Sequence, residues 1–515
     1  MSNPSPLNRR EFCKLMAAGT VGLALASGSG EAEEMTRPNI LLLMADQFRG
    51  DCLGCDGNKV IKTPNLDRIA REGAHFVHGY SSTPTCTPAR AALLTGLSPW
   101  HHGMIGYGGV AKKYPFELPS AMNDAGYYTF VIGKCHYSPQ RNLHGFQGAL
   151  LDESGRAHTP GFVSDYRKWF KEQAPGKDPD ATGIGWNDYR SKQYALPEEL
   201  HPTRWTGDRA VDFISTYDKK EPFMLKVSFA RPHSPYDPPK RFWEMYKDED
   251  MPAPHIGRWA SKFAKGDSEN FTSWHGDMGM DQAKRSRRGY YGSITFIDEE
   301  IGKILKALED KGQLDNTLIV FIADHGDMMM DHYHWRKSYP YEGSARIPYL
   351  IRWPKSIQAK RGIKIEQPVE IRDILPTFLD AAGAKSPGDL DGKSLLDLVR
   401  GKTSGWREYI DLEHGVCYAP ENHWNALTDG RWKYIYSAFD GSQQLFNLDK
   451  DPGELDDLAQ DAAHAGELKK WRGRMVKHLS ERGEPFVVHG DLGVHPAKMI
   501  YSPLFPGDKV DVKVK

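Results

Sequence analysis

The sequence has few cysteines, almost no net charge and no long apolar run after its N-terminus. Six of its 515 residues are cysteine, which excludes the disulfide framework of a small secreted domain. Lys and Arg number 67 against 68 for Asp and Glu, so no overall positive field favours nucleic-acid binding. Beyond residue 28, no segment reaches the length of a membrane span. The composition, 39% apolar and 26% charged, is that of a globular chain.

The N-terminus carries the pattern of an export signal. Arg9 and Arg10 precede the weakly apolar stretch Leu15–Gly28, within which Ala24–Ala26 resembles a cleavage site. Paired arginines at this place are typical of a bacterial twin-arginine signal. The stretch is too short and too rich in Gly and Ala to span a bilayer. We therefore expect residues 1–26 to be a removable signal peptide and the mature chain to be periplasmic or secreted.

Short apolar runs alternate with helical patterns over the first four hundred residues. The runs, apolar on both faces, are Asn39–Asp46, Tyr127–Lys134, Phe223–Ala230 and Thr317–Asp324. Such runs are typical of buried parallel strands, whereas 205–220 and 293–312 repeat apolar residues at helical spacing. The alternation predicts an α/β fold with a large, doubly wound, mostly parallel mixed sheet flanked by helices.

The pattern changes near Thr403. Residues 431–437 and 443–459 predict antiparallel strands and turns, and 467–483 predict a helix. We therefore expect a catalytic domain over 37–403 and a smaller C-terminal α+β domain over 404–515.

Polar residues end three of the predicted strands. Asp46, Lys134 and Asp324 each close an apolar run, and the carboxyl ends of parallel strands border the ligand crevice of such a fold. We expect these three side chains in that crevice, although an isolated strand-end Asp is equally suited to cap a helix.

Cys86 lies in an unusual context. Its segment, Pro84–Gly96 (PTCTPARAALLTG), resembles the first signature of type I sulfatases at every position. Gly126–His136 resembles the second signature, with Cys135 where that family commonly has an aromatic residue. The resemblance extends over residues 37–455 and implies an alkaline-phosphatase-like fold.

The resemblance implies a catalytic set and a metal site. Cys86 would be oxidised to formylglycine by a maturase before folding. The implied metal ligands are Asp46, Gln47, Asp324, His325 and the modified Cys86. The residues implied to bind the sulfate group are Arg90, Lys134, His233 and Lys337. Among these, His233 would protonate the leaving alcohol, while His136 would act as the base that completes the cycle.

Two positions depart from the family pattern. Many members have Asp where Gln47 stands and Asn where His325 stands. With a nitrogen ligand at His325, the donor set is no longer made of hard oxygen atoms alone, which favours Mn²⁺ or Zn²⁺. We expect one divalent cation, with Ca²⁺ first and Mn²⁺ as the alternative.

The sequence therefore predicts hydrolysis of a sulfate monoester, a carbohydrate or aryl sulfate, to an alcohol and inorganic sulfate. The Asp-Gln and Asp-His pairs also resemble phosphonate monoester hydrolases, so a phosphonate monoester or phosphodiester hydrolase is the alternative. An inactive protein that binds sulfated glycans would follow if Cys86 stays unmodified. We expect the loops 151–200 and 236–288 to shape the substrate pocket.

Other polar residues have simpler interpretations. Cys52 and Cys55 form a weak redox motif without partner ligands, and Cys135 and Cys417 are interpreted as structural thiols. The basic run Lys284–Arg288 predicts a solvated face, with the steering of an anionic substrate as the alternative. Further candidates for substrate contact, each weaker than the core set, are His101, His102, His144, His332 and His334.

Overall fold

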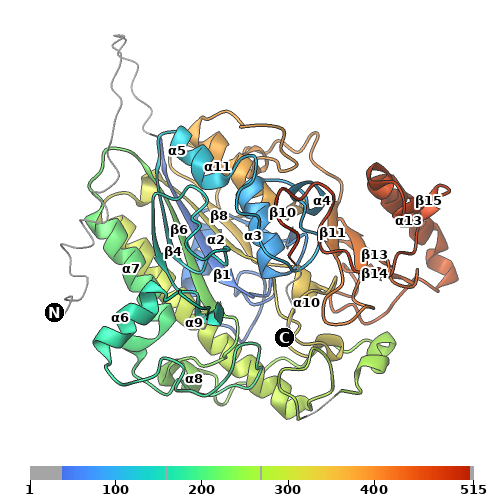
Figure 1. Ribbon diagram of the computed structural model, residues 1–515, viewed down its shortest axis with the longest axis horizontal. Coiled ribbons are helices and arrows are strands. Elements are labelled where there is room, and N and C mark those ends of the chain that lie inside the picture. The colour runs from blue at the N-terminus through green and yellow to red at the C-terminus, as the bar shows by residue number, and fades with distance from the viewer. Residues whose placement is uncertain (1–36, 157–158, 267–268, 511–515) are drawn as a thin grey trace, which may run out of the picture.

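The computed structural model describes residues 37–156, 159–266 and 269–510. A sheet of eight strands forms its centre, in the order β5-β4-β6-β1-β7-β8-β2-β9 (Figure 1). In that order the strands are Gly148–Leu151, Tyr128–Gly133, Phe223–Pro232, Asn39–Asp46, Thr317–Ala323, Tyr349–Arg352, Ala74–Phe76 and Ile363–Ile365. From β5 to β7 all neighbours pair in parallel, while β8 is antiparallel to β7 and β2.

The four apolar runs form the middle of this sheet. Every residue of β1, β4, β6 and β7 is buried, which is why these strands are apolar on both faces. The predicted strands and the mixed, mostly parallel sheet are confirmed.

Helices cover both faces of the sheet (Figure 1). On one face lie α2 (Pro64–Arg71), α7 (Pro202–Thr216) and α9 (Met280–Asp310), and on the other α3 (Cys86–Thr95), α5 (Leu118–Asp124) and α11 (Ile374–Ala382). In the described part of the chain that precedes the C-terminal sheet, the other α-helices are α4 (Pro99–His102), α6 (Asp165–Gln173), α8 (Lys240–Met245), α10 (Glu342–Ala345) and α12 (Leu395–Val399).

Helix α9 is longer than its apolar repeat predicts. It buries the expected row of Ile294, Ile297, Ile301, Leu305 and Leu308. It begins at Met280, however, so the basic run lies within its first turns. The expectation that this run is a solvated face is wrong for Arg287, which is buried and pairs with Asp331 at 2.6 Å.

A second sheet follows in the C-terminal part, seen in orange to red in Figure 1. Its antiparallel strands are β11 (Ile410–His414), β12 (Trp424–Thr428), β13 (Trp432–Ser437) and β14 (Gln443–Asn447). Helix α13 (Ala465–Leu479) packs on it through Trp471, Met475 and Leu479. The short pairs β3 (Gly79–Tyr80) with β10 (Val369–Glu370), and β15 (Val487–Val488) with β16 (Asp491–Leu492), complete the strands. The C-terminal antiparallel sheet is confirmed, and the boundary at residue 404 stays a prediction.

The predicted signal peptide lies outside the described residues. Within the ranges that the structure describes, no helix combines the length and apolar character needed to cross a membrane.

Gly133 provides a test of how the sheet is built. It ends β4 with φ of 96°, and a Cβ atom there would lie 2.0 Å from the main-chain oxygen of Ser228 on β6. Gly133→Ala should reduce the free energy of unfolding by about 3 kcal/mol, because backbone strain and the clash add. The measurement is the thermal unfolding midpoint.

Gly473→Ala is the matched control, because a Cβ on this residue of α13 meets no atom within 4 Å. It should leave the unfolding midpoint unchanged or raise it. The gain in free energy of unfolding is at most the helix-propensity difference between Gly and Ala, about 1 kcal/mol. Equal midpoints for the two variants would contradict the packing described at Gly133.

Candidate active site

Strand-end side chains meet at the carboxyl edge of the central sheet. Asp46 is the last residue of β1, and Lys134 and Asp324 directly follow β4 and β7. Lys134 forms an ion pair with Asp46, and both side chains are buried. The structure thus brings together the three residues that the sequence places in the ligand crevice.

Cys86 is the first residue of α3, which is buried along its whole length. The Sγ atom lies 3.1 Å from Nε2 of His325 and 3.5 Å from Nζ of Lys337. Thr85, which precedes the helix, contacts Nε2 of His414 through its hydroxyl at 2.6 Å. A residue of the C-terminal sheet therefore helps to fix the start of the helix that carries Cys86.

The thiol of Cys86 is not activated as an ordinary nucleophile. Burial raises its pKa to about 11, and the neighbouring carboxylate of Asp46 adds to this effect. Nucleophilic cysteines have lowered pKa values instead. The unmodified side chain is therefore a neutral thiol at physiological pH.

Arg90 lies one helical turn after Cys86, on the same face of α3. Its guanidinium donates to Oδ2 of Asp324 at 2.9 Å and to the main-chain oxygen of Lys134 at 2.8 Å. It is fully buried and does not line the cavity described below. The guanidinium of Arg90 contacts Asp324 and Lys134 at the strand ends. It does not face the cavity in which the resemblance would place the sulfate group.

The carboxylates of Asp46 and Asp324 stay ionised although both side chains are fully buried. Burial would raise the pKa of Asp46, but the charge of Lys134 and the other cationic groups around it hold that pKa well below its usual range. Burial would also raise the pKa of Asp324, but the charges of Arg90 and Lys134 hold that pKa well below its usual range. Two anionic oxygen donors are thus available side by side.

The donor atoms around Cys86 fit a divalent cation. Ligand atoms of Asp46, Cys86, Asp324 and His325 all lie within 4.8 Å of one another. Nδ1 of His325 donates to the main-chain oxygen of Gly326 at 2.9 Å, which leaves Nε2 with a free lone pair toward the cluster. Two carboxylates and one imidazole nitrogen are a donor set that Ca²⁺, Mn²⁺ or Zn²⁺ accepts.

Gln47 adds an oxygen donor through an orientation that the sequence does not predict. Its Nε2 donates to Oδ2 of Asp327 at 2.5 Å, and Asp327 also accepts from the hydroxyl of Tyr236. The amide oxygen consequently points to the site, where Nζ of Lys337 lies 2.8 Å away. Asp327 is a positioning residue that sequence reasoning missed.

His233 contacts Lys337 on the wall of the cavity above Cys86. Nζ of Lys337 donates to Nε2 of His233 at 2.9 Å, while Nδ1 donates to the main-chain oxygen of Ser234. Trp186 stacks on the imidazole with ring centroids 4.0 Å apart and planes at 16°. Burial and the charge of Lys337 hold the pKa of His233 well below its usual value, so the ring is neutral here.

His136 also lines the cavity. Its main-chain nitrogen donates to Oε1 of Glu153 at 2.7 Å, which supports a left-handed backbone with φ of 59°. Nδ1 has no hydrogen-bond partner among the described residues. Burial and the charge of Lys134 lower the pKa of His136, so its ring can accept a proton.

The cavity has a volume of about 430 Å³. Both loops expected to shape the pocket contribute to it, through Arg156 and Trp186 from the first and Thr272 from the second. Its other lining residues are Thr85, Cys86, Tyr107, Lys134, His136, Gly155, Asn187, His233, Arg336, Lys337, Cys417 and Tyr418. Four of these side chains are cationic, and no carboxylate lines the cavity within the described part of the chain.

The weaker candidates lie elsewhere. Among the described residues that line this cavity, none of the five further histidines appears. Cys52 and Cys55 are free thiols, and burial raises the pKa of each. Cys135 is buried beside the site, but Cys417 lines the cavity, which the interpretation as a purely structural thiol did not anticipate.

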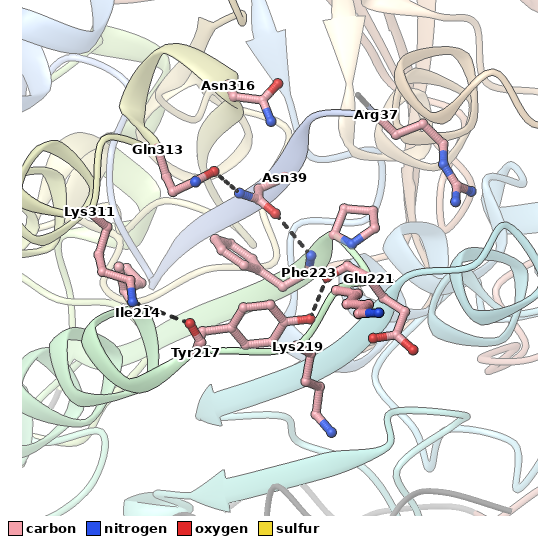
Figure 2. A pocket seen from close by; sticks show the side chains of 12 residues that line it. Arg37, Asn39, Ile214, Tyr217, Lys219, Glu221, Phe223, Lys311, Gln313 and Asn316 are labelled. Carbon is pink, nitrogen blue, oxygen red and sulfur yellow. Dashed lines mark hydrogen bonds between the residues drawn. The ribbon is translucent and has the colours of Figure 1, made fainter. Parts of the chain in front are cut away.

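Another cavity, of about 550 Å³, lies at the opposite edge of the sheet (Figure 2). Its lining includes Asn39 at the start of β1 and Phe223 at the start of β6. Asn39 accepts from the Phe223 nitrogen and donates to Gln313, both at 3.0 Å. Neither His nor Cys lines it among the described residues, so it lacks the reactive groups that gather at the carboxyl edge.

Comparisons with known proteins agree with this geometry. The sulfatase family matches residues 38–384, and the C-terminal domain of N-sulphoglucosamine sulphohydrolase matches residues 330–481. An arylsulfatase of Clostridium perfringens is 42% identical over 468 residues, which are 87% of this chain and 96% of that protein. A choline-sulfatase of Rhizobium meliloti is 31% identical over 450 residues, which are 82% and 83% of the two chains.

A solved structure shows the same fold. The phosphonate monoester hydrolase of Agrobacterium radiobacter superposes with a TM-score of 0.75 at 25% identity, over 89% of this chain and 100% of that one. The family match covers more than half of the chain, from β1 to the end of α11, and includes the strand-end cluster and α3. The chain therefore belongs to the sulfatase family of hydrolytic enzymes.

Proposed function

We propose that the protein hydrolyses the sulfate monoester of a carbohydrate or aryl alcohol to the alcohol and inorganic sulfate. The observation that carries this proposal is the cation-lined cavity above Cys86, with Lys134 and Lys337 beside the thiol position. A sulfate monoester is an anion, and fixed cations stabilise the charge that develops on its oxygens during transfer.

We infer that Cys86 is converted to formylglycine, whose hydrated aldehyde supplies the attacking hydroxyl. Cys86 is 2% exposed and lies at the start of a buried helix, so a maturase reaches it only before the chain folds. The twin-arginine signal fits this order, because that route exports folded proteins. The enzyme would accordingly work in the periplasm or outside the cell.

The proposed metal site uses Asp46, Gln47, Asp324, His325 and the residue derived from Cys86. When bound, the cation supplies charge neutralisation and lowers the pKa of a coordinated hydroxyl. Ca²⁺ is the first choice because four of these five side chains offer oxygen, and Mn²⁺ is the alternative because His325 offers nitrogen.

The roles of the other residues follow from their positions. Arg90, fully buried against Asp324, holds the carboxylates in place, so we assign it a positioning role. Lys134 and Lys337 face the cavity and bind the sulfate oxygens. Nζ of Lys337, 2.9 Å from Nε2 of the neutral His233, supplies the proton that His233 passes to the leaving alcohol, and His136 accepts one in the second half of the cycle.

The lining of the cavity restricts the alcohol. Choline carries a quaternary ammonium, and a cavity that is lined by four cationic side chains and, among the described residues, by no carboxylate repels such a group. The aromatic rings of Tyr107, Trp186 and Tyr418 instead offer flat apolar surface to a ring. An aryl or sugar alcohol therefore fits better than choline.

A phosphonate monoester hydrolase is the second candidate. The superposition on such an enzyme and the Asp-Gln and Asp-His pairs favour it. The two candidates separate when kcat/KM is measured side by side on 4-nitrophenyl sulfate and a phenyl phosphonate monoester. Faster turnover of the phosphonate would decide for the second candidate.

The proposed conversion of Cys86 to formylglycine can be tested directly. Protein made together with a formylglycine-generating maturase should yield a Cys86 peptide that has lost its sulfur and reacts with a hydrazide. The Cys52 peptide of the same digest should keep its thiol, which makes it an internal control. An active preparation with intact thiol at Cys86 would overturn the mechanism. An unmodified and inactive one, even after co-expression with the maturase, would support the glycan-binding alternative.

The second prediction concerns the metal. Asp324→Ala should abolish both turnover and bound cation in elemental analysis, because the remaining donors cannot hold the ion. Asp327→Asn should weaken metal affinity about 10–100-fold, since the Gln47 amide loses its anionic acceptor. Asp315→Ala, at a half-exposed site remote from the cluster, is the control. Unchanged activity after exhaustive chelation would refute a metal-dependent site.

The third prediction separates the two histidines. His233→Ala should slow the first half of the reaction about 10²–10⁴-fold, most strongly on unactivated sugar sulfates, whose alcohols need a proton to leave. His136→Ala should release about one equivalent of alcohol per site and then stall. Rapid-quench kinetics on an aryl sulfate and a sugar sulfate test both expectations. Equal losses for both variants on both substrates would show that the roles are not divided in this way.

A further inference from the structure

A separate cavity of about 430 Å³ lies where the C-terminal sheet meets the catalytic part of the chain. One side is formed by the 3-10 helix η3 (Arg258–Phe263) and the segment after β7, and the other by β12 to β14. The volume lies within the range of small-ligand sites. No role proposed so far uses it.

Aromatic rings dominate the wall of this cavity. They are Trp259, Phe263, Trp274, Tyr339, Tyr341 and Trp424. Polar groups on the same wall include the side-chain amides of Asn422, Gln443 and Gln444. Aromatic faces pack against the apolar CH face of a pyranose, and amides hydrogen-bond to its hydroxyls. The mixture is the one that a sugar ring requires.

Two buried polar atoms in the wall lack partners. Nδ2 of Asn422 and Nδ1 of His334 make no hydrogen bond to any described residue. Asn422 is 8% exposed and His334 is 2% exposed, so both side chains are more than nine-tenths buried. A buried polar group that stays unsatisfied destabilises the structure. Both residues also line the cavity, so a ligand hydroxyl that displaces the side chains covering these atoms can pair with them.

The charge of this cavity is opposite to that of the active site. Glu421, Asp440 and Asp457 line it against a single cation, Lys262. A sulfated or uronic ring is therefore repelled here, whereas the active-site cavity attracts one. The ligand that fits is an uncharged sugar ring.

The two cavities share an aromatic partition. Tyr418 lines the active-site cavity, and its ring lies 6.4 Å from Trp274 at an interplanar angle of 6°. It also lies 6.2 Å from Tyr339, and both neighbours line the second cavity. A ring in one cavity and a ring in the other thus lie on either side of this partition, and a glycan that occupies both cavities must pass over its edge.

We propose that the second cavity binds an uncharged pyranose ring, and that the substrate is an oligosaccharide joining a sulfated ring to a neutral one. The statement about the substrate rests on the proposed function, whereas the statement about sugar binding does not. One experiment is needed for each part.

Binding is tested on the full chain without turnover. Cellobiose, lactose and N,N′-diacetylchitobiose are titrated while tryptophan fluorescence and saturation-transfer NMR are recorded. At least one should bind saturably, and Phe263→Ala and Asn422→Ala should each weaken it roughly five-fold. Trp432→Ala, a half-buried ring outside both cavities, should leave binding unchanged. No saturable binding, or equal binding by all variants, would overturn the proposal.

Kinetics then tests the link to the substrate. The ratio of kcat/KM on a sulfated disaccharide with one neutral ring to kcat/KM on 4-nitrophenyl sulfate should fall roughly five-fold in Phe263→Ala. The ratio should stay constant in Trp432→Ala. An unchanged ratio in a variant that has lost sugar binding would overturn the statement about the substrate. If no sulfate ester is hydrolysed at all, the proposed function fails, and the binding experiment still decides the sugar site.

Discussion

The active end of this molecule depends on the pairing of two buried carboxylates with two buried cations. Asp46 and Asp324 stand at the ends of neighbouring strands, where both side chains are fully buried and their like charges repel each other. Arg90 and Lys134 compensate them, and an unpaired buried charge would cost several kcal/mol. Because each partner comes from a different element, the register of β1, β4 and β7 and the placement of α3 are fixed together.

Two cavities of similar volume but opposite charge lie on either side of Tyr418. The first is lined by cations and leads to Cys86, and the second is lined by aromatic rings, amides and carboxylates. Electrostatics of this kind sorts the parts of a ligand by charge before any close contact forms. Under the proposed function, the fold would combine a reaction centre at Cys86 with a second surface that selects the part of the substrate next to the sulfate.

Much of the fold and the core of the site follow from local sequence. The strands are predictable because burial on both faces demands continuous apolar runs, and Asp46 and Asp324 are placed by those strands. Asp327 and Trp186 carry no such signal, since their importance arises from contacts with Gln47 and His233 far away in the chain. The start of α9 is not predictable for the same reason. The charge of Arg287 is compensated by Asp331, a partner far away in the chain, and no local pattern reveals that pairing.

The hydrogen bond between Thr85 and His414 has a consequence for modularity. His414 lies on β11, in the same strand as Glu413, whose carboxylate forms a two-fold ion pair with Arg482. Residues near the C-terminus are thereby connected to the residue beside Cys86. A chimera that takes its C-terminal part from a relative must therefore also reproduce the contact between His414 and Thr85. Without that contact, the start of the helix that carries Cys86 is no longer held in place.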